Sequence, residues 1–184
     1  MDTLMLILFG IILVICLIIG IYLTLYNKIQ DYIIRINEVE AIIDNNLREK
    51  YDNINKIVSI IKGNDKIKIE KKILEEIVKL KTKKISNFNF DRKLVETTNY
   101  FTSLKESNKE IKNNKEIIQI SNKIDELDDL LLVNKEYYNR NIAEYNKLIK
   151  LFPTNIVASI SKYEEKLFFD RKDMSDNDYN DFKL

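Results

Sequence analysis

The stretch 138-YNRNIAEYNKLIKLFP-153 decides the fold class of this chain. It contains three residue pairs that recur at intervals of seven positions: Tyr138-Asn139, Tyr145-Asn146 and Phe152-Pro153. Seven residues correspond to two helical turns, so the pattern predicts that all three pairs line one face of a single helix. Pro153 is expected to end that helix, because proline cannot continue the hydrogen-bond ladder. The stretch therefore predicts a helical architecture, but it supplies no nucleophile, metal ligand shell or phosphate-binding loop.

The N-terminal segment is strongly apolar. Residues 4–25 include sixteen Leu, Ile, Val or Phe side chains, and no charged residue occurs from Thr3 to Asn27. At about 1.5 Å per residue, a helix of this length spans about 33 Å, which matches a bilayer. A signal peptide would have a basic start and a small-residue cleavage site, and neither is present. We therefore expect a short N-terminus at 1–3, a transmembrane helix at 4–25 and contact with the lipid bilayer through these residues.

The charges that flank this segment predict its orientation. No Lys or Arg precedes it, whereas Lys28 and Arg35 follow it closely. Lys and Arg accumulate on the cytoplasmic side of membrane proteins. We expect a single-pass protein of the cell membrane with its N-terminus outside and its helical domain in the cytoplasm.

The composition of the remaining chain favours an all-α fold. After the apolar segment the only Gly is Gly63 and the only Pro is Pro153, which leaves few residues for tight turns. The sequence predicts an antiparallel bundle of three to four long helices over residues 26–169. Residues 170–184 are rich in Asp and Asn and are expected to form a disordered polar tail. The net charge of +1 gives no reason to expect a nucleic-acid partner.

Apolar residues at steps of three and four predict the individual helices. A first amphipathic helix continues the transmembrane segment to Lys62, with Gly63 as its C-cap and Asn64-Asp65 as a turn. A second helix is expected at 66–86 and a last one at 116–152. Between them, a helix with its N-cap at Asp91 is expected to reach Ser107, with Leu94 and Val95 on its apolar face. Interruptions are expected at 87–90 and 108–115. A short helix after Pro153 is expected to finish at Phe168-Phe169. Two arrangements remain open: three long legs with a bent second leg, or four separate antiparallel helices that return Phe152-Pro153 to the membrane side.

Few residues are candidates for chemistry. Asp128, Lys135 and Tyr138 form the best available catalytic set, although helical bundles of this kind rarely contain a cleft. The acidic residues Asp125, Glu126, Asp128 and Asp129 favour a solvated helix face over a weak cation site, because such sites need several converging oxygens. The chain contains no His, which excludes the Glu-x-x-His sites of di-iron bundles. We expect no catalytic, metal or cofactor site and no small-molecule substrate.

The single cysteine leaves one further alternative open. Cys16 lies within the apolar segment, so no disulfide framework exists. Cys16 and Gly20 form a small-xxx-small pair that either brings two anchors together in a homo-oligomer or faces lipid.

These residues resemble a known family. The series of pairs from Tyr138 to Pro153, followed by Ala158 and preceded by Tyr26-Asn27 after an N-terminal anchor, is similar to the LemA family of bacterial membrane proteins. The first helix agrees with that pattern at Asn37, Val39, Glu40, Ala41, Asp44, Leu47, Arg48, Tyr51-Asp52 and Val58, whereas Asn55-Lys56 replaces the family's Pro-Asn pair. The resemblance implies a helical bundle on a single anchor, facing the cytoplasm, with no established enzymatic activity. Family members are often encoded beside membrane proteases.

The function expected from these features is that of a scaffold or interaction module at the bacterial membrane, with a membrane or cytoplasmic protein as its partner. The resemblance suggests an alternative, a regulatory adaptor of a membrane protease. A carboxylate-based enzyme is the alternative from a different class. For the motif residues Tyr26, Asn27, Tyr138, Asn139, Tyr145, Asn146, Phe152 and Pro153, a structural role is favoured over a ligand or partner surface, because buried polar residues in helical seams set register.

Overall fold

The computed structural model describes residues 3–63, 67–82 and 86–169. Helices form nearly all of these residues, which confirms the predicted all-α class. The described residues divide into two compact units. We call residues 3–38 and 138–168 the anchor unit, and residues 39–137 with Phe169 the bundle unit. Helices α1 and α5 contribute to both units.

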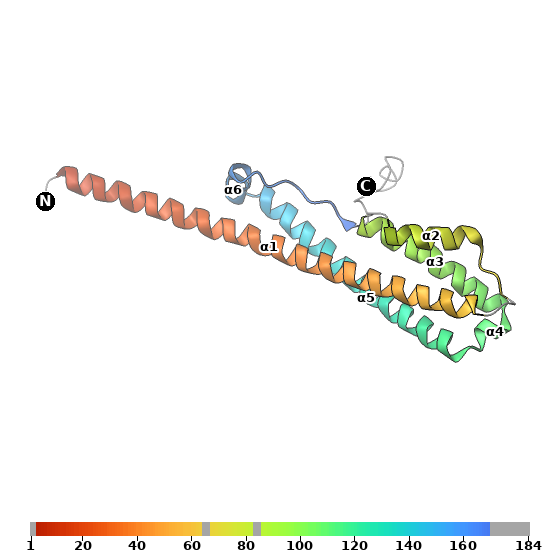
Figure 1. Cartoon of the computed structure of the whole chain (residues 1–184). Coiled ribbons are helices and arrows are strands. Elements are labelled where there is room, and N and C mark those ends of the chain that lie inside the picture. The colour runs from red at the N-terminus through yellow and green to blue at the C-terminus, as the bar shows by residue number, and fades with distance from the viewer. Residues whose placement is uncertain (1–2, 64–66, 83–85, 170–184) are drawn as a thin grey trace, which may run out of the picture. The chain divides into compact units, whose positions relative to one another are not determined.

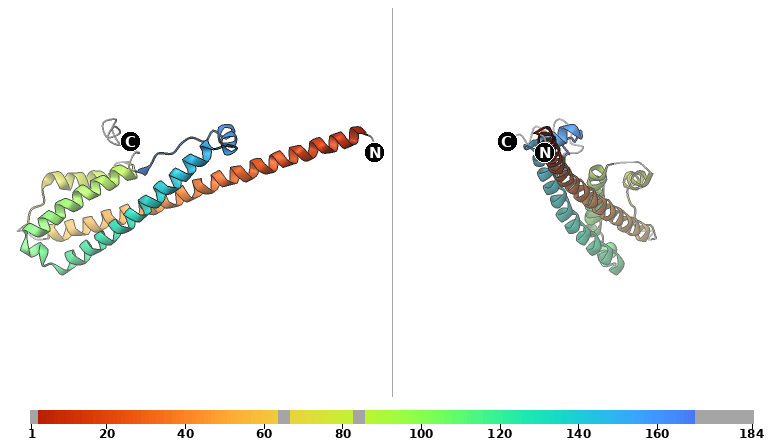
Figure 2. Two further views of the ribbon diagram at one scale, coloured as in Figure 1. Left: turned by 180° about the vertical axis from the view of Figure 1, so that it is seen from behind. Right: turned by 90° about the vertical axis from the view of Figure 1, so that its left-hand side faces the viewer.

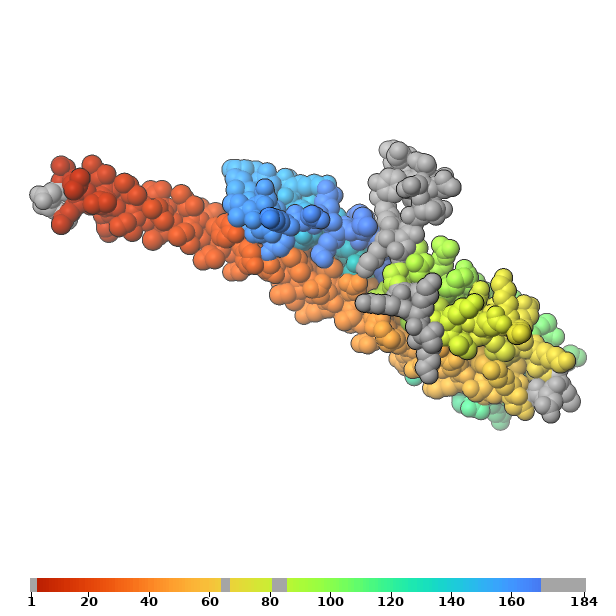
Figure 3. Space-filling model, turned by 45° about the horizontal axis from the view of Figure 1, so that its top comes forward, coloured from red at the N-terminus to blue at the C-terminus, as the bar shows by residue number. Residues whose placement is uncertain are grey.

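Helix α1 covers Thr3–Lys62 without a break, as the sequence predicted. Its N-terminal part has a mean hydropathy of 3.4 over an 18-residue window, and it is long and apolar enough to cross a membrane. None of that window is buried inside the protein. In the space-filling view of Figure 3, the N-terminal part of α1 stands clear of the other segments of its unit. An apolar helix of this length matches the thickness of a bilayer.

The remainder of α1 is amphipathic, and it buries one apolar stripe. The stripe comprises Ile29, Ile36, Val39, Ile43, Leu47, Ile54, Ile57 and Ile61. The helix ends where predicted, since the Gly63 N–H donates to the Ser59 carbonyl at 3.2 Å in a closing turn. The predicted turn at Asn64-Asp65 lies outside the described residues.

Two shorter helices follow in the bundle unit, and their bounds correct the prediction. Helix α2 covers Lys71–Thr82, and helix α3 covers Asn87–Ser107. The predicted interruption at 87–90 is wrong, because these residues form the first turn of α3. Ser86 is the N-cap of α3, and its side chain accepts a hydrogen bond from the Asn89 N–H. Asp91, predicted as the cap, lies inside the helix and is buried.

Asparagine side chains cap the next helices. Helix α4, Lys109–Lys112, begins after Asn108, whose Oδ1 accepts from the Glu110 N–H at 2.9 Å. Helix α5, Lys115–Lys150, begins after Asn114, whose Oδ1 accepts from the Glu116 N–H at 3.0 Å. The polar run at 108–115 separates α3 from α5 as predicted, but its residues 109–112 form the short helix α4 instead of a turn, and its asparagines cap α4 and α5.

The bundle unit settles the choice between three legs and four helices. Its part of α1, α2, α3 and its part of α5 run alternately in opposite directions, as Figures 1 and 2 show from two sides. The side chains agree with this order, since the Tyr51 hydroxyl donates to the Ile77 carbonyl at 3.1 Å and Tyr51 packs against Phe90 at a centroid distance of 6.0 Å. The core contains residues from all four helices, including Leu47, Ile77, Leu94 and Leu131. The four-helix arrangement is confirmed, with α2 much shorter than the others.

In the anchor unit, the C-terminal part of α5 leads into the short helix α6, Thr154–Ile160. The predicted continuation of this helix to Phe168-Phe169 is wrong. The chain leaves α6 at Ser161, and Lys162 adopts a φ of 55°, in the left-handed region that ends helices. Residues 163–168 then form an irregular segment, which we call the strap, and Phe169 packs in the bundle unit against Phe88.

Candidate functional site

The second Tyr-Asn pair of α5, Tyr145-Asn146, contacts the strap within the anchor unit. Tyr138 and Tyr145 are buried, two turns apart, as the seven-residue spacing predicted. The Tyr145 hydroxyl donates to the Glu164 carbonyl at 3.0 Å. Asn146 makes two bonds to Lys166: its Nδ2 donates to the carbonyl, and its Oδ1 accepts from the N–H, both at 2.8 Å. An asparagine that satisfies both backbone groups of one residue replaces the pairing that a neighbouring strand would supply.

Helix α1 contacts the other end of the same segment. The rings of Tyr26 and Tyr163 lie 6.2 Å apart, and the Gln30 amide donates to the Tyr163 hydroxyl. The Tyr22 hydroxyl and the Ser161 Oγ are 3.2 Å apart and share a hydrogen bond. The chain after α6 is therefore held from both sides, by α1 and by α5.

The third pair does not share the buried face. Helix α5 ends at Lys150, two residues before Phe152, so the helical register that places Tyr138 and Tyr145 inward no longer applies. Phe152 and Pro153 form a turn, and the Phe152 side chain is 79% exposed. The prediction that all three pairs line one helix face is wrong for this pair.

The structure thus brings three of the predicted motif residues, Tyr26, Tyr145 and Asn146, onto the segment 163–166. Asn27 is exposed and Asn139 is half-buried. Sequence reasoning missed the strap as their common neighbour, because its backbone groups carry no signal of their own in the sequence. These contacts are of the kind that a structural role requires, and the assignment of that role stays a prediction.

The two hydrogen bonds between Asn146 and Lys166 give a direct test of the contact between α5 and the strap. We expect Asn146→Ala to accelerate amide exchange at Lys166 by about fivefold to tenfold, because a hydrogen bond of this kind contributes about 1 kcal/mol. Asn146→Asp keeps the acceptor for the Lys166 N–H and should have a smaller effect. Hydrogen–deuterium exchange on the full chain measures this, with the exposed neighbour Lys147→Ala as a control. Equal protection of Lys166 in Asn146→Ala and Lys147→Ala would contradict the role of Asn146.

Tyr145 makes the anchor unit sensitive to alkaline pH. Burial, with a further effect of the Glu164 carboxylate, raises the pKa of Tyr145 above its usual value of about 10. The unfolded chain therefore loses this proton first, so the contribution of neutral Tyr145 is complete below pH 10 and is lost as pH rises through the higher folded-state pKa.

We expect Tyr145→Phe to lower the free energy of unfolding by about 1 kcal/mol at neutral pH, because the hydrogen bond to Glu164 is lost. Above pH 10 its stability should decline less steeply with pH than that of the wild type. Some decline remains in the variant, because burial also raises the pKa of Tyr163. Thermal unfolding followed at several alkaline pH values measures both effects, and parallel pH curves for the two proteins would disprove the titration argument.

In the bundle unit, the predicted catalytic set does not assemble. Asp128 forms an ion pair with Lys50 of α1, whose side chain is completely buried. Lys135 pairs instead with Asp91 of α3, and its Nζ lies 5.3 Å from the centroid of the Phe169 ring. The carboxylate and the amine of the set therefore each neutralise a different partner, and Tyr138 belongs to the anchor unit.

The acidic residues of α5 do not converge on a cation site. Asp125, Glu126 and Asp129 are exposed, and Asp128 is taken up by its pair with Lys50. Across residues 3–63, 67–82 and 86–169, no group of three or more His, Cys, Asp or Glu side chains could hold a metal ion. Asp125, Glu126 and Asp129 thus lie on a solvated helix face, as the sequence favoured, whereas Asp128 does not.

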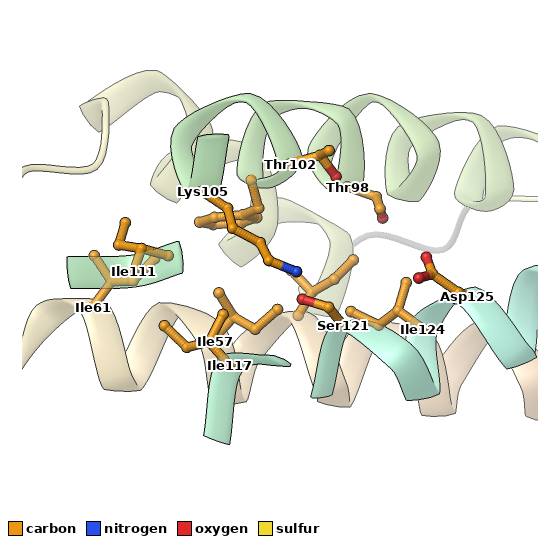
Figure 4. Close-up of a pocket in the computed structure, with 12 residues that line it drawn as sticks. Ile57, Ile61, Thr98, Thr102, Lys105, Ile111, Ile117, Ser121, Ile124 and Asp125 are labelled. Carbon is orange, nitrogen blue, oxygen red and sulfur yellow. The ribbon is translucent and has the colours of Figure 1, made fainter. Parts of the chain in front are cut away.

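A cavity in the bundle unit lies between α1, α3 and α5. It has a volume of about 30 Å³, and its walls include the apolar residues Ile57, Ile61 and Ile124 together with polar groups of Thr98, Lys105 and Ser121. Lys105 extends from α3 toward Ser121 on α5 (Figure 4). This volume corresponds to about one water molecule and is far below the several hundred Å³ of sites for organic ligands.

On the apolar N-terminal part of α1, Cys16 and Gly20 lie on the exposed surface. A Cβ atom added at Gly20 would meet no other group of the described chain. This surface leaves both sequence interpretations open, a contact with a second anchor and a contact with lipid.

Comparison with known proteins agrees with the resemblance inferred from the motifs. The model of the LemA family matches residues 40–180, which include the Tyr-Asn pairs of α5 and the strap that Tyr145 and Asn146 contact. Neither the curated proteins nor the solved structures yield a match. The match extends over well more than half of the 184 residues. A helical chain with an N-terminal helix apolar enough to span a membrane, and with this match, belongs to the LemA family.

Proposed function

We propose that this protein is a single-pass membrane scaffold whose helical bundle presents an apolar helix face to another protein and performs no catalysis. The observation that carries this proposal is a row of exposed apolar side chains on α5. Leu130, Val133 and Tyr137 recur at steps of three and four, so they share one helix face, and each is exposed by 43% or more. Clustered apolar residues on a protein surface typically mark interaction sites.

The internal use of charged side chains supports the absence of catalysis. A catalytic site needs titratable groups that converge in a pocket. In the bundle unit, Asp128 and Lys135 are instead bound in separate ion pairs, and the cavity between α1, α3 and α5 is too small for an organic substrate.

Site-specific photo-crosslinking in cells tests the proposal. A photoreactive amino acid at Val133 should capture a protein partner, whereas one at Val95 should not. Val95 is a matched control, because it is the same residue type, is also exposed and lies on α3. A truncated variant that begins at Lys28, with the same photoreactive residue, shows whether capture needs the membrane anchor.

Each outcome has a defined meaning. Capture at Val133 that is lost on Leu130→Asp, with unchanged circular dichroism, supports a scaffold with a protein partner. A protease among the captured proteins would assign the adaptor role. Products that contain only this chain would mean a homo-oligomeric scaffold, and no product from Val133 above the Val95 level would exclude this face as the interaction surface.

The proposed orientation places the N-terminus outside and the helical domain, residues 26–169, in the cytoplasm. It is supported by Lys28 and Arg35, which follow the apolar segment while no Lys or Arg precedes it. A reporter fused after Leu184 that is active only in the cytoplasm tests this, and activity of a reporter that works only outside would reverse the assignment.

A further inference from the structure

Helix α6 and the turn before it have an unusual outer surface. Residues 151–161 contain no charged side chain, and Lys150 and Lys162 flank them. The inner face of α6, formed by Thr154, Val157 and Ala158, is buried. The outer face is apolar as well: Phe152 is 79% exposed, Ile156 51% and Ile160 64%. A helix on the surface of a water-soluble protein normally directs polar residues outward.

The position of α6 along α1 indicates the surroundings of this apolar face. Ser161, directly after α6, shares a hydrogen bond with Tyr22. Tyr22 lies three residues before the end of the apolar segment at Leu25, which is about 5 Å along the helix. All of these residues belong to the anchor unit, so their relative positions are defined. If residues 4–25 span the bilayer, the C-terminal end of α6 lies at its boundary.

Two further features match the membrane boundary. Tyr22, Tyr26 and Tyr163 cluster there, with ring centroids 6.2 Å apart in each of the pairs Tyr22–Tyr26 and Tyr26–Tyr163. Tyrosine is enriched at the level of the lipid headgroups. In Figure 1, α6 is seen almost end-on while α1 runs across the view, so the axis of α6 crosses that of α1 steeply. A helix that lies along a membrane surface has this orientation relative to a spanning helix.

We propose that α6 and the preceding turn insert Phe152, Ile156 and Ile160 into the interfacial layer of the same bilayer that α1 spans. The occupant of this apolar face is lipid, because the face lies at the level where the fully exposed apolar surface of α1 ends. Lys162 is exposed and is placed to reach the headgroup phosphates, whereas the Lys150 Nζ pairs with the Glu165 carboxylate at 2.8 Å. The protein is then attached to the membrane at two places, through the spanning part of α1 and through α6 at the interface. This inference rests on the proposed membrane-spanning role of residues 4–25.

Depth-dependent fluorescence quenching tests this attachment on the full chain. On a Cys16→Ser background, single cysteines at Ile160, Ile156, Ile34 and Ile12 carry an environment-sensitive dye. The proteins are reconstituted in vesicles of phosphatidylcholine and phosphatidylglycerol, with spin labels either near the glycerol or near the chain ends. Ile34 is the matched control, because it is 54% exposed in the same unit and lies nine residues beyond Leu25.

We expect the labels at Ile160 and Ile156 to be quenched severalfold more than the label at Ile34, and more by shallow than by deep spin labels. The label at Ile12 should show the opposite depth preference. Quenching at Ile160 no greater than at Ile34, with Ile12 quenched normally, would overturn the interfacial attachment and leave the anchor intact. Blue-shifted emission of the label at Ile160 without quenching by the spin-labelled lipids would mean that a protein covers this face. That result would also overturn the interfacial attachment. Loss of quenching at Ile12 would refute the anchor itself.

Discussion

Replacing Asp128 with alanine is expected to lower the free energy of unfolding of the bundle unit by about 3 kcal/mol. The side chain of Lys50 is completely buried, whereas that of Asp128 is 40% exposed. Removing the carboxylate leaves a buried ammonium group without a counter-charge, and the loss of one partner of a buried pair costs about 3–5 kcal/mol. The expected cost is at the lower end, because water reaches the Asp128 side of the pair.

The reverse substitution should cost less. Lys50→Met keeps most of the side-chain volume and leaves behind a carboxylate that water can solvate, so we expect a loss of about 1 kcal/mol. The double variant Lys50→Met with Asp128→Ala should regain most of the stability lost in Asp128→Ala, since no unpaired buried charge remains.

Urea unfolding of the full chain in detergent, followed by circular dichroism, measures these differences. The matched control is Glu49→Ala, which breaks the exposed pair of Glu49 and Lys123 at 2.6 Å between the same two helices. Exposed pairs contribute about 1 kcal/mol or less. If Asp128→Ala and Glu49→Ala had equal effects, burial of Lys50 would not govern the energy of the pair.

The second large effect is expected in the core, where Leu94→Ala should cost about 3 kcal/mol. Leu94 of α3 is completely buried, and a leucine-to-alanine change at such a site removes apolar burial and leaves a cavity, at a cost of about 2–5 kcal/mol. Val95→Ala, at the next position of the same helix, should cost less than about 1 kcal/mol, because Val95 is 41% exposed. The same urea titration gives both values. A cost for Val95→Ala as large as that for Leu94→Ala would mean that α3 is rotated relative to the core described above.

The apolar periodicity of the sequence predicted the long helices because burial of one stripe decides their formation. It failed where a local hydrogen bond decides instead. Residue type predicts an N-cap at Asp91, but Ser86 performs that role, and Asp91 lies one turn before Leu94 on the face that packs inward. The prediction that Val95 shares the apolar face of Leu94 is wrong, because adjacent helix positions differ by about 100° and cannot share a narrow stripe.

Lys50 carries a signal in the sequence itself. It lies three residues after Leu47 and four before Ile54, within the stripe that α1 buries. A lysine at such a position predicts a buried charge and therefore an acidic partner on another helix. The identity of that partner, Asp128, depends on the register between α1 and α5, and no local pattern specifies that register.

The unbroken course of α1 has a mechanical consequence. No turn or linker separates the apolar segment from the part of α1 that reaches Glu38 in the anchor unit, and Tyr22, Tyr26 and Gln30 fasten that part to the chain after α6. A spanning helix responds to a thinner bilayer by tilting. With no turn or linker in α1, such a tilt of a span at residues 4–25 would turn the rest of the anchor unit with it.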